Sequence, residues 1–564
     1  MKGIGKTILI TSVIMMIGIG TLCVFLYKQG EKSQEIKKEQ KLSELDMLYE
    51  GYQKATIDKD AAVKLSDRGE HANLKTIEYE KTDNVYSLDR STQTKKQLER
   101  WKKLGDYSLD SPLFVWNLYG TNRLSMYTYF ETPDPYSIEY SICVEDPAIP
   151  DFTRIGYIKG GRSVTQKHEY QLIGFIPGMT NYIVFRVYDK DHEIIAKRQF
   201  SIDVPKLPGN TATRLKAESG SSKENMTNGL FFVMDDSDTP HILMYDNSGI
   251  IRGELPLVSG CSADMVFLTH EMYYEYDNGK LAKVDALGQV TNLYSLDEYD
   301  VTGSFMYNGY GQIWMTGKKK NSKHSDLLLS LSLSSGKVEI LADFKKLLPE
   351  VYQNMNHSTD WISLGSLAMT GTSDVLVAAE NLSSLIHLKY VTTDKVRIDY
   401  ILGDSAIWKN TKYKSLLLKP AKGEEEKTAH GKLSFVSYNS FGKFSKNYDI
   451  GVFNPKYIDA SKYKGLDSTL RSDKKGNESF YYMYGIQPKK NKYILKRSFE
   501  INASMDGGGI QSFSDHLIIS CNEISQYGEY DKTGRVLYKY KGNKTLQIHR
   551  VVKQTMKDFW FQDL

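Results

Sequence analysis

The chain of 564 residues is poor in the features that define several classes of protein. Its four cysteines (Cys23, Cys143, Cys261 and Cys521) are too few for a disulfide scaffold, and no two have the spacing of zinc ligands. The 73 basic and 69 acidic side chains leave a net charge of only +4, which gives no electrostatic signature of nucleic-acid binding. We therefore expect neither a zinc site nor a nucleic-acid partner.

One stretch lacks charge altogether, at residues 7–27. As a helix it would extend roughly 31 Å at about 1.5 Å per residue, which is enough to cross a bilayer. A cleavable signal has a shorter apolar core, so we expect an uncleaved anchor over residues 1–28, with a cleaved signal peptide as the alternative. Basic residues flank both sides, but such a segment usually exports the one large domain that follows it. We expect a single-pass protein of the cell membrane with its bulk on the extracytoplasmic side.

Proline is also scarce, with 14 residues against 43 glycines and 39 tyrosines, a balance that favours strands and tight turns. Residues 29–110 are the exception, because they are charged and helix-forming, and they predict a helical stalk. Residues 111–207 alternate with period two, as in RLSMYTYFET and YSIEYSICVE, and predict a small β-sandwich. Within it, residues 170–188 resemble the Leu-x-x-Pro-Gly turn and Tyr-containing strand of fibronectin type III-like modules.

The remainder, residues 208–564, repeats a hairpin in which a strand leads through a polar turn to a second strand. The turn markers are 39, 48, 59, 96 and 43 residues apart and comprise Gly249, Gly288, Gly336, Lys395, Asn491 and Gly534. The typical step is close to the roughly 40 to 50 residues of a propeller blade, and the step of 96 indicates a long insertion or one unrecognised hairpin. We predict an all-β chain with a β-propeller of six blades behind the sandwich, with seven blades as the alternative. Propellers bind ligands at the central channel.

A family resemblance lies in the run DWISLGSLAMTGTSDVLVAAENLSSLIHLKYVTTDKVRIDYILGDSAIWKN at residues 360–410, followed by YKSLLLKP at residues 413–420. This region resembles the signature of bacterial arylsulfate sulfotransferases, which are exported six-bladed propellers with a small β-sandwich in front. The similarity extends from about residue 120 to the end. It implies a phenolic sulfate donor, a phenol acceptor and a histidine that holds the sulfuryl group as a sulfohistidine. It also implies that no nucleotide sulfate donor, metal or cofactor is used.

The residues that the family uses are only partly present. Ser363 stands where the family has a histidine, Glu380 where it has an arginine, and the position of an early histidine falls at about Gly303. The segment TAHGKLSFVSYNSFG offers His430 as the nucleophile and Asn439 at the family's asparagine position. A unit charge about 4 Å from a sulfuryl group contributes roughly 4 kcal/mol at a dielectric of 20, so an acid at position 380 disfavours sulfate binding.

Other residues near the motif are possible pocket residues. We expect Trp361 and Trp408 to be packing anchors, with a role as substrate platforms as the alternative. We expect His357 to lie on the surface. His387 and Lys419 are possible substitutes for the missing groups, but His387 alternates within a strand and Lys419 begins a loop. The glycines at 507–509 predict a close backbone approach in the last blade, with anion binding as the alternative.

Three functions follow, in order of preference. The first is a membrane-anchored arylsulfate sulfotransferase with His430 as nucleophile. The second is a propeller that has lost this chemistry and binds a ligand or protein partner at the central channel. The third is a structural surface protein. The natural donor and acceptor, the oligomeric state and the pairing of the cysteines stay open, although three exported cysteines leave at least one unpaired.

Overall fold

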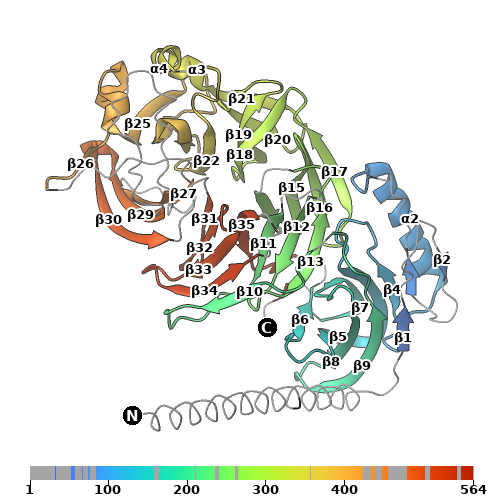
Figure 1. The fold of residues 1–564 in the computed structure, drawn as a ribbon. Helices are drawn as coiled ribbons and strands as arrows, with labels where there is room; N and C mark the ends of the chain where they lie inside the picture. Colours follow the sequence, from blue (N-terminus) through green and yellow to red (C-terminus); the bar gives the residue numbers. More distant parts are fainter. Residues whose placement is uncertain are drawn as a thin grey trace, which may run out of the picture.

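The computed structural model describes residues 84–157, 164–209, 211–235, 240–260, 264–355, 357–423, 434–437, 447–454, 479–501, 508–542, 546 and 548–562, with short pieces at 32, 53–56, 66–67 and 74–76. Most of these residues form antiparallel strands (Figure 1). The predicted anchor at 7–27, together with His430, Asn439 and Cys261, lies outside the described residues. No helix in the described part of the chain is long and apolar enough to cross a membrane.

The period-two runs after residue 110 form strands, as predicted. They are β4 (Leu113–Trp116), β5 (Ser125–Val144), β6 (Phe152–Gly156), β7 (Thr165–Ile173), β8 (Thr180–Tyr188) and β9 (Ile194–Asp203). The register of β5 shifts between Glu131 and Tyr136, so its first half pairs with β4 and β7 and its second half with β6 and β8. Phe114 lies 5.1 Å from Phe200 and 6.4 Å from Phe185, ring centre to ring centre, so the two halves pack face to face.

The predicted helical stalk is only partly helical in the described residues. Helix α2 (Leu88–Leu104) begins after Ser87, whose side chain accepts a hydrogen bond from the backbone N–H of Arg90. It buries Leu98 in the same cluster as Leu113 of β4, so it packs on the sandwich. The short strands β1 (Gln53–Thr56), β2 (Ser66–Asp67) and β3 (Leu74–Thr76) join the sandwich sheet, where β1 pairs with β9 and β3 with β4. The described strands β1 and β3 of this segment therefore belong to the sandwich sheet, and helix α2 packs on it.

The rest of the described chain forms six sheets of four or five strands. Three of them are built from consecutive strands. The second sheet in chain order contains β14 (Met265–Leu268), β15 (Glu271–Asp277), β16 (Lys280–Asp285) and β17 (Val290–Ser295), and the third contains β18 (Tyr299–Tyr307), β19 (Gln312–Lys319), β20 (Leu327–Ser332) and β21 (Val338–Asp343). The fourth contains β22 (Leu364–Met369), β23 (Val375–Ala379), β24 (Ser384–Lys389) and β25 (Arg397–Gly403). Small helices α3 (Phe344–Leu347) and α4 (Pro349–Asn354) separate the last two of these sheets.

The other three sheets use strands from distant parts of the chain. The fifth contains β27 (Ser434–Ser437), β28 (Tyr448–Asn454), β29 (Ser479–Gln487), β30 (Lys492–Ile501) and the edge strand β26 (Lys419–Pro420). The sixth contains β31 (Gly508–Phe513), β32 (His516–Cys521), β33 (Gln526–Tyr530), β34 (Val536–Lys541) and β10 (Lys216–Ser219). The C-terminal strand β35 (Ile548–Gln554) pairs with β11 (Leu230–Asp235), followed by β12 (His241–Tyr245) and β13 (Ile251–Pro256).

All six predicted turn markers lie in equivalent places, between the third and fourth strand of their sheet counted from the innermost strand. Gly249, Gly288, Gly336 and Gly534 have φ between 72° and 90°, a left-handed conformation that favours glycine. The repeat is thus confirmed. The long step before Asn491 contains helices α5 (Ser405–Trp408) and η2 (Lys412–Leu416) and strand β26 among its described residues.

The innermost strands of the six sheets form a ring. Strand β14 contacts β18, which contacts β22, and the contacts continue through β27 and β31 to β35. The ring closes where Arg550 of β35 forms an ion pair of 3.0 Å with Asp264, the residue before β14. Antiparallel sheets with inner strands in a ring are the arrangement of a β-propeller (Figure 1).

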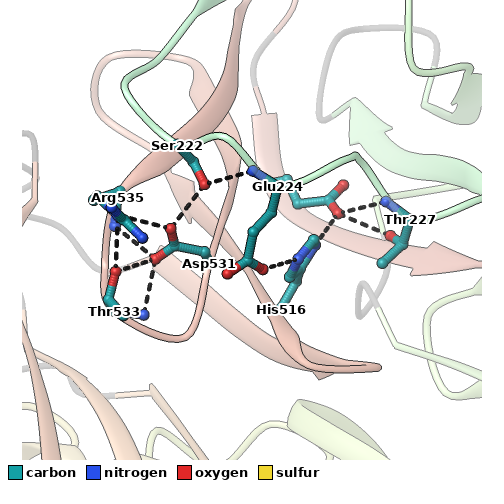
Figure 2. A network of polar contacts seen from close by, with 8 residues as sticks. Ser222, Glu224, Thr227, His516, Asp531, Thr533 and Arg535 are labelled. Atoms are coloured by element: carbon teal, nitrogen blue, oxygen red, sulfur yellow. Dashed lines mark hydrogen bonds and ion pairs between the residues drawn. The ribbon is translucent and has the colours of Figure 1, made fainter.

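A strap at residues 222–227 links β10 of one sheet to β11 of the next, and polar contacts fasten it to strands β32 and β33 (Figure 2). Ser222 Oγ donates a 2.7 Å hydrogen bond to Asp531, the residue after β33. The carboxylate of Glu224 lies 3.0 Å from His516 Nε2. The strap therefore crosses from the last sheet to the first, and its polar side chains form hydrogen bonds and ion pairs with the last sheet.

A buried ion pair lies beneath the strap. Lys553 Nζ is 2.6 Å from Glu529 Oε2, and neither side chain is exposed. Glu529 also accepts hydrogen bonds of 2.9 Å from the backbone and hydroxyl of Thr227 and lies 2.6 Å from His516 Nδ1. Burial lowers the pKa of Lys553 to about 8 even though Glu529 acts in the opposite direction. The contact between the last sheet and β35 thus buries Glu529 against Lys553 and His516.

The propeller and the sandwich share an apolar core that includes residues of both. The final strand β36 (Phe561–Gln562) pairs with β6 of the sandwich. The guanidinium of Arg154 lies 4.2 Å from the ring centre of Phe152 and 5.1 Å from that of Phe561. Trp560 Nε1 donates a 3.2 Å hydrogen bond to Gln171. The end of the chain therefore fixes the two parts to each other.

Candidate functional site

The D-W motif forms a turn that precedes β22. Asp360 Oδ1 accepts hydrogen bonds from the backbone N–H groups of Ile362 at 3.3 Å and Ser363 at 3.1 Å, while Oδ2 accepts one from Ser325 at 2.9 Å. Ser363 has a φ of 49°, which is uncommon for a residue other than glycine. The carboxylate of Asp360 thus holds the turn in which Ser363 takes a strained backbone conformation.

The two tryptophans of the motif are fully buried in one apolar cluster. Trp361 Nε1 donates a 3.2 Å hydrogen bond to Asp326, and Trp408 Nε1 donates a 2.8 Å bond to Ser384 Oγ. Both rings are therefore packing anchors of the sheet β22–β25, the fourth in chain order, as the sequence predicts.

Two neighbouring inner strands carry β-bulges at or beside the positions where the resemblance implies functional residues. In β18 the register shifts between Val301 and Phe305, a stretch that includes Gly303. In β22 the register shifts between Leu364 and Leu367. Bulges redirect the backbone and are frequent beside functional sites, so both strands depart from regular pairing where they approach each other.

Direct contacts join the two bulges. Thr316 Oγ1 accepts a hydrogen bond from the backbone N–H of Ser304 at 3.1 Å and donates one to the carbonyl of Gly365 at 3.0 Å. A Cβ atom at Gly303 would lie 2.6 Å from both Thr316 Oγ1 and the Gly365 carbonyl oxygen. This backbone has no room for the histidine that the family has at this position.

Glu380 lies against the same place. It begins helix η1 (Glu380–Leu382), its backbone N–H donates to the Ser363 carbonyl at 3.1 Å, and its Oε2 accepts a 3.2 Å bond from Ser363 Oγ. A side chain at Gly365 would collide with the Glu380 carboxylate. The structure thus brings together the three substituted positions. We call these five residues the inner cluster: Gly303, Thr316, Ser363, Gly365 and Glu380.

An arginine that sequence reasoning missed lies next to the inner cluster. Arg550 Nη1 donates a 2.9 Å hydrogen bond to Ser304 Oγ, and its guanidinium meets Asp264 with Nη2–Oδ1 and Nη1–Oδ2 distances of 3.0 and 3.1 Å. Its side chain is 21% exposed, against 8% for Asp264. Arg550 follows the last predicted turn marker, Gly534, in sequence, and only closure of the ring brings it beside β18. No local pattern indicates that contact.

The remaining candidates lie elsewhere. His357 is exposed, stacks on Tyr352 at 4.1 Å and donates from Nε2 to the Tyr352 carbonyl at 2.6 Å. His387 is buried in β24, with Nε2 2.6 Å from Thr370 Oγ1, and Lys419 lies exposed in the edge strand β26. In the described residues, none of these three side chains is hydrogen-bonded to the inner cluster.

The described part of the chain contains no group of three or more His, Cys, Asp or Glu side chains that could hold a metal ion. Cys143 and Cys521 are buried, and they do not form a disulfide with each other. Burial raises the pKa of the Cys521 thiol to about 12. The Cys521 thiol is therefore poorly suited to act as a nucleophile at neutral pH.

Comparison with solved structures finds matches at low similarity. U3-55K is 8% identical and aligns over 64% of this chain and 92% of its own, with a TM-score of 0.32. The periplasmic gluconolactonase PpgL of Pseudomonas aeruginosa is 10% identical over 74% of this chain and 99% of its own, with a TM-score of 0.30. A putative 6-phosphogluconolactonase of Bacteroides fragilis is 8% identical over 75% of this chain and 99% of its own, with a TM-score of 0.28. A likeness at this level says nothing about activity.

No curated protein matches the chain. A family model does, over residues 216–499, which is just over half of the chain and includes the D-W motif, the inner cluster and most of the propeller. The match supports an arylsulfotransferase-like function, with phenolic substrates, in general terms. The chain belongs to the arylsulfotransferase (ASST) family.

Proposed function

We propose that the protein binds phenols at the inner cluster and does not transfer sulfuryl groups through a sulfohistidine. The observation that carries this proposal is the carboxylate of Glu380 in the middle of the cluster, where it accepts a hydrogen bond from Ser363. A carboxylate accepts a hydrogen bond from a phenolic hydroxyl, whereas the oxygens of a sulfate ester can only accept. The site therefore suits the phenol of the family's reaction better than the sulfate.

Energetics support the loss of transfer. An acid in place of the family's arginine changes an attraction of roughly 4 kcal/mol into a repulsion of similar size at about 4 Å. Each missing preorganised donor typically costs about a hundredfold to a thousandfold in rate. The Gly365 carbonyl and the Thr316 hydroxyl leave no room for a side chain at Gly303, where the resemblance implies an imidazole.

The second candidate function is sulfuryl transfer from a phenolic sulfate to a phenol, with His430 as the nucleophile. The family match favours it, and in sequence His430 stands four residues before the inner strand β27. Arg550 would then supply the cation for the sulfuryl oxygens, because it lies beside the bulge of β18. A neutral imidazole would attack the sulfur, and the phenolate would leave.

The location of the protein also remains a proposal. We propose a membrane anchor at residues 1–28, a segment at 29–110 that leads to the sandwich at 111–207, and a propeller of six blades at 208–564 on the extracytoplasmic side. The uncharged stretch at residues 7–27 and the six sheets of the described residues support this division. Protease accessibility of the propeller on intact cells tests it, since an internal propeller would be protected.

The test of the proposed function uses the full chain in detergent. Titration calorimetry with phenol should show binding, and Glu380→Gln should weaken it about tenfold, because a charge-assisted hydrogen bond becomes a neutral one. The exposed Glu339, paired with Lys337 on β21, provides the matched control Glu339→Gln, which should change nothing.

The same preparation is then incubated with 4-nitrophenyl sulfate and phenol. We expect no release of nitrophenolate from wild type or from His430→Ala. Release by wild type that His430→Ala abolishes would overturn the proposal and establish the second candidate. Absence of phenol binding would overturn the proposal as well.

A further inference from the structure

Arg550 is held in a fixed orientation beside the inner cluster. Both oxygens of Asp264 face its guanidinium at 3.0 and 3.1 Å, and Asp264 Oδ2 also accepts a 2.9 Å hydrogen bond from the backbone N–H of Phe305. Two carboxylate contacts and one to Ser304 fix the plane of the guanidinium. An arginine braced in this way binds a further acceptor at little cost in side-chain entropy.

The surroundings leave room for this side chain. Gly509 of β31 faces Arg550, and a Cβ atom there would lie 3.0 Å from Arg550 Cγ and 2.8 Å from Ser520 Oγ. This is the close approach that the run of glycines predicts. The guanidinium has five N–H donors, and in the described residues its contacts to Asp264 and Ser304 use three of them. A fifth of the side chain is exposed to solvent, so a ligand can reach part of it.

A short series of contacts connects Arg550 to the inner cluster. Arg550 bonds to Ser304, Ser304 bonds through its backbone to Thr316, and Thr316 bonds to Gly365, which packs against Glu380. These residues come from the three sheets that contain β35, β18 and β22. A positively charged donor and a negatively charged acceptor thus lie at the two ends of one series of contacts.

Resting on the proposed function, we propose that Arg550 is the second binding group of the site and that its ligands are phenols with an acidic substituent. The phenolic hydroxyl donates to Glu380, and a carboxylate or sulfonate at the far end of the ring accepts from Arg550. A phenol with a cationic substituent would meet the guanidinium with a like charge. The site would therefore select among phenols by the charge opposite the hydroxyl.

The experiment compares phenol with three acids of increasing length: 4-hydroxybenzoate, 4-hydroxyphenylacetate and 3-(4-hydroxyphenyl)propionate. Tyramine serves as the cationic analogue. By titration calorimetry on the full chain, the best acid should bind about tenfold more tightly than phenol, and tyramine more weakly than phenol. In Arg550→Ala that preference should disappear while the affinity for phenol is unchanged, and Arg550→Lys should keep part of it.

Arg535 offers a matched control, because it too pairs with an aspartate, Asp531, but lies in the turn between β33 and β34. Arg535→Ala should leave all affinities unchanged. Since Arg550→Ala leaves Asp264 without its ion pair, the double variant Asp264→Asn/Arg550→Gln removes both charges and should lose the preference in the same way.

Equal affinity of wild type for phenol and all three acids would overturn the inference but leave the proposed function intact. Loss of phenol and acid binding by the same factor in both Arg550 variants would show that Arg550 only maintains the structure. Failure of every compound to bind wild type would overturn the proposed function itself.

Discussion

The turn scaffold and the inner cluster are adjacent, yet they relate to the family in opposite ways. The scaffold comprises Asp360, Trp361, Asn381 and Trp408, and each has a structural role: capping a turn, filling the core or tying η1 to the turn. The inner cluster contains Ser363 and Glu380, which are hydrogen-bonded to each other, at positions where the resemblance implies a histidine and an arginine. On the proposed function, residues that hold the site persist in this chain while the residues that would do the chemistry have changed.

The comparison predicts large stability effects in the scaffold and large binding effects in the inner cluster. Trp361→Ala should produce the largest change, because it removes a fully buried ring and a hydrogen bond to Asp326. We expect a loss of about 3 to 5 kcal/mol in unfolding free energy, measured by denaturant unfolding. Tyr310→Ala, at a ring that is 63% exposed, is the control and should cost under about 0.5 kcal/mol. Equal losses would break the distinction.

The second prediction concerns pH. The His387 side chain, 3.3 Å from Asp399, does most to lower the pKa of Asp399 to about 2; partial burial opposes this and Lys389 assists it. A depressed pKa stabilises the fold above the unfolded value of about 3.8, and this stabilisation is lost as pH falls through about 2.

Asp399→Asn should therefore cost about 1 to 2 kcal/mol at neutral pH, after allowance for solvent screening, and nothing below pH 2. Melting temperatures across pH check this, with the exposed Asp394→Asn as control. A cost that does not depend on pH would show that packing, and not charge, fixes Asp399.

The third prediction restores the family's residues with little expected effect on stability. Ser363→His/Glu380→Arg should change the unfolding free energy by about 1 kcal/mol or less, since both side chains are half-buried. It should raise the affinity for 4-nitrophenyl sulfate at least about tenfold, because a cation replaces an acid. Turnover should stay absent, because Gly303 still lacks an imidazole. Unfolding of this variant, or an unchanged affinity, would show that the cluster is not a binding surface.

Much of this fold could be predicted from sequence, because strands and turns leave local patterns. Gly249, Gly288, Gly336 and Gly534 mark equivalent turns, and alternation identifies the sandwich strands. The packing of α2 and the pairing of β1 and β3 with the sandwich could not be predicted from the sequence. Strands pair with a sheet edge through backbone hydrogen bonds, which depend little on the side chains.

The site shows the same limit. The resemblance located Ser363, Glu380 and Gly303, which the structure brings together through two bulges. Arg550, Asp264 and Ser304 could not be predicted, because they meet only when the C-terminal strand closes the ring. Local motifs identify a site on one sheet, whereas groups contributed by distant sheets depend on the closed fold.

The most direct test of the central claim is a crystal structure of the protein soaked with 4-bromophenol, whose bromine is located by anomalous scattering. We predict the ring beside Gly303 and Gly365, with its hydroxyl within hydrogen-bond distance of the Glu380 carboxylate. A bromophenol bound elsewhere, or none bound at a saturating concentration, would contradict the claim.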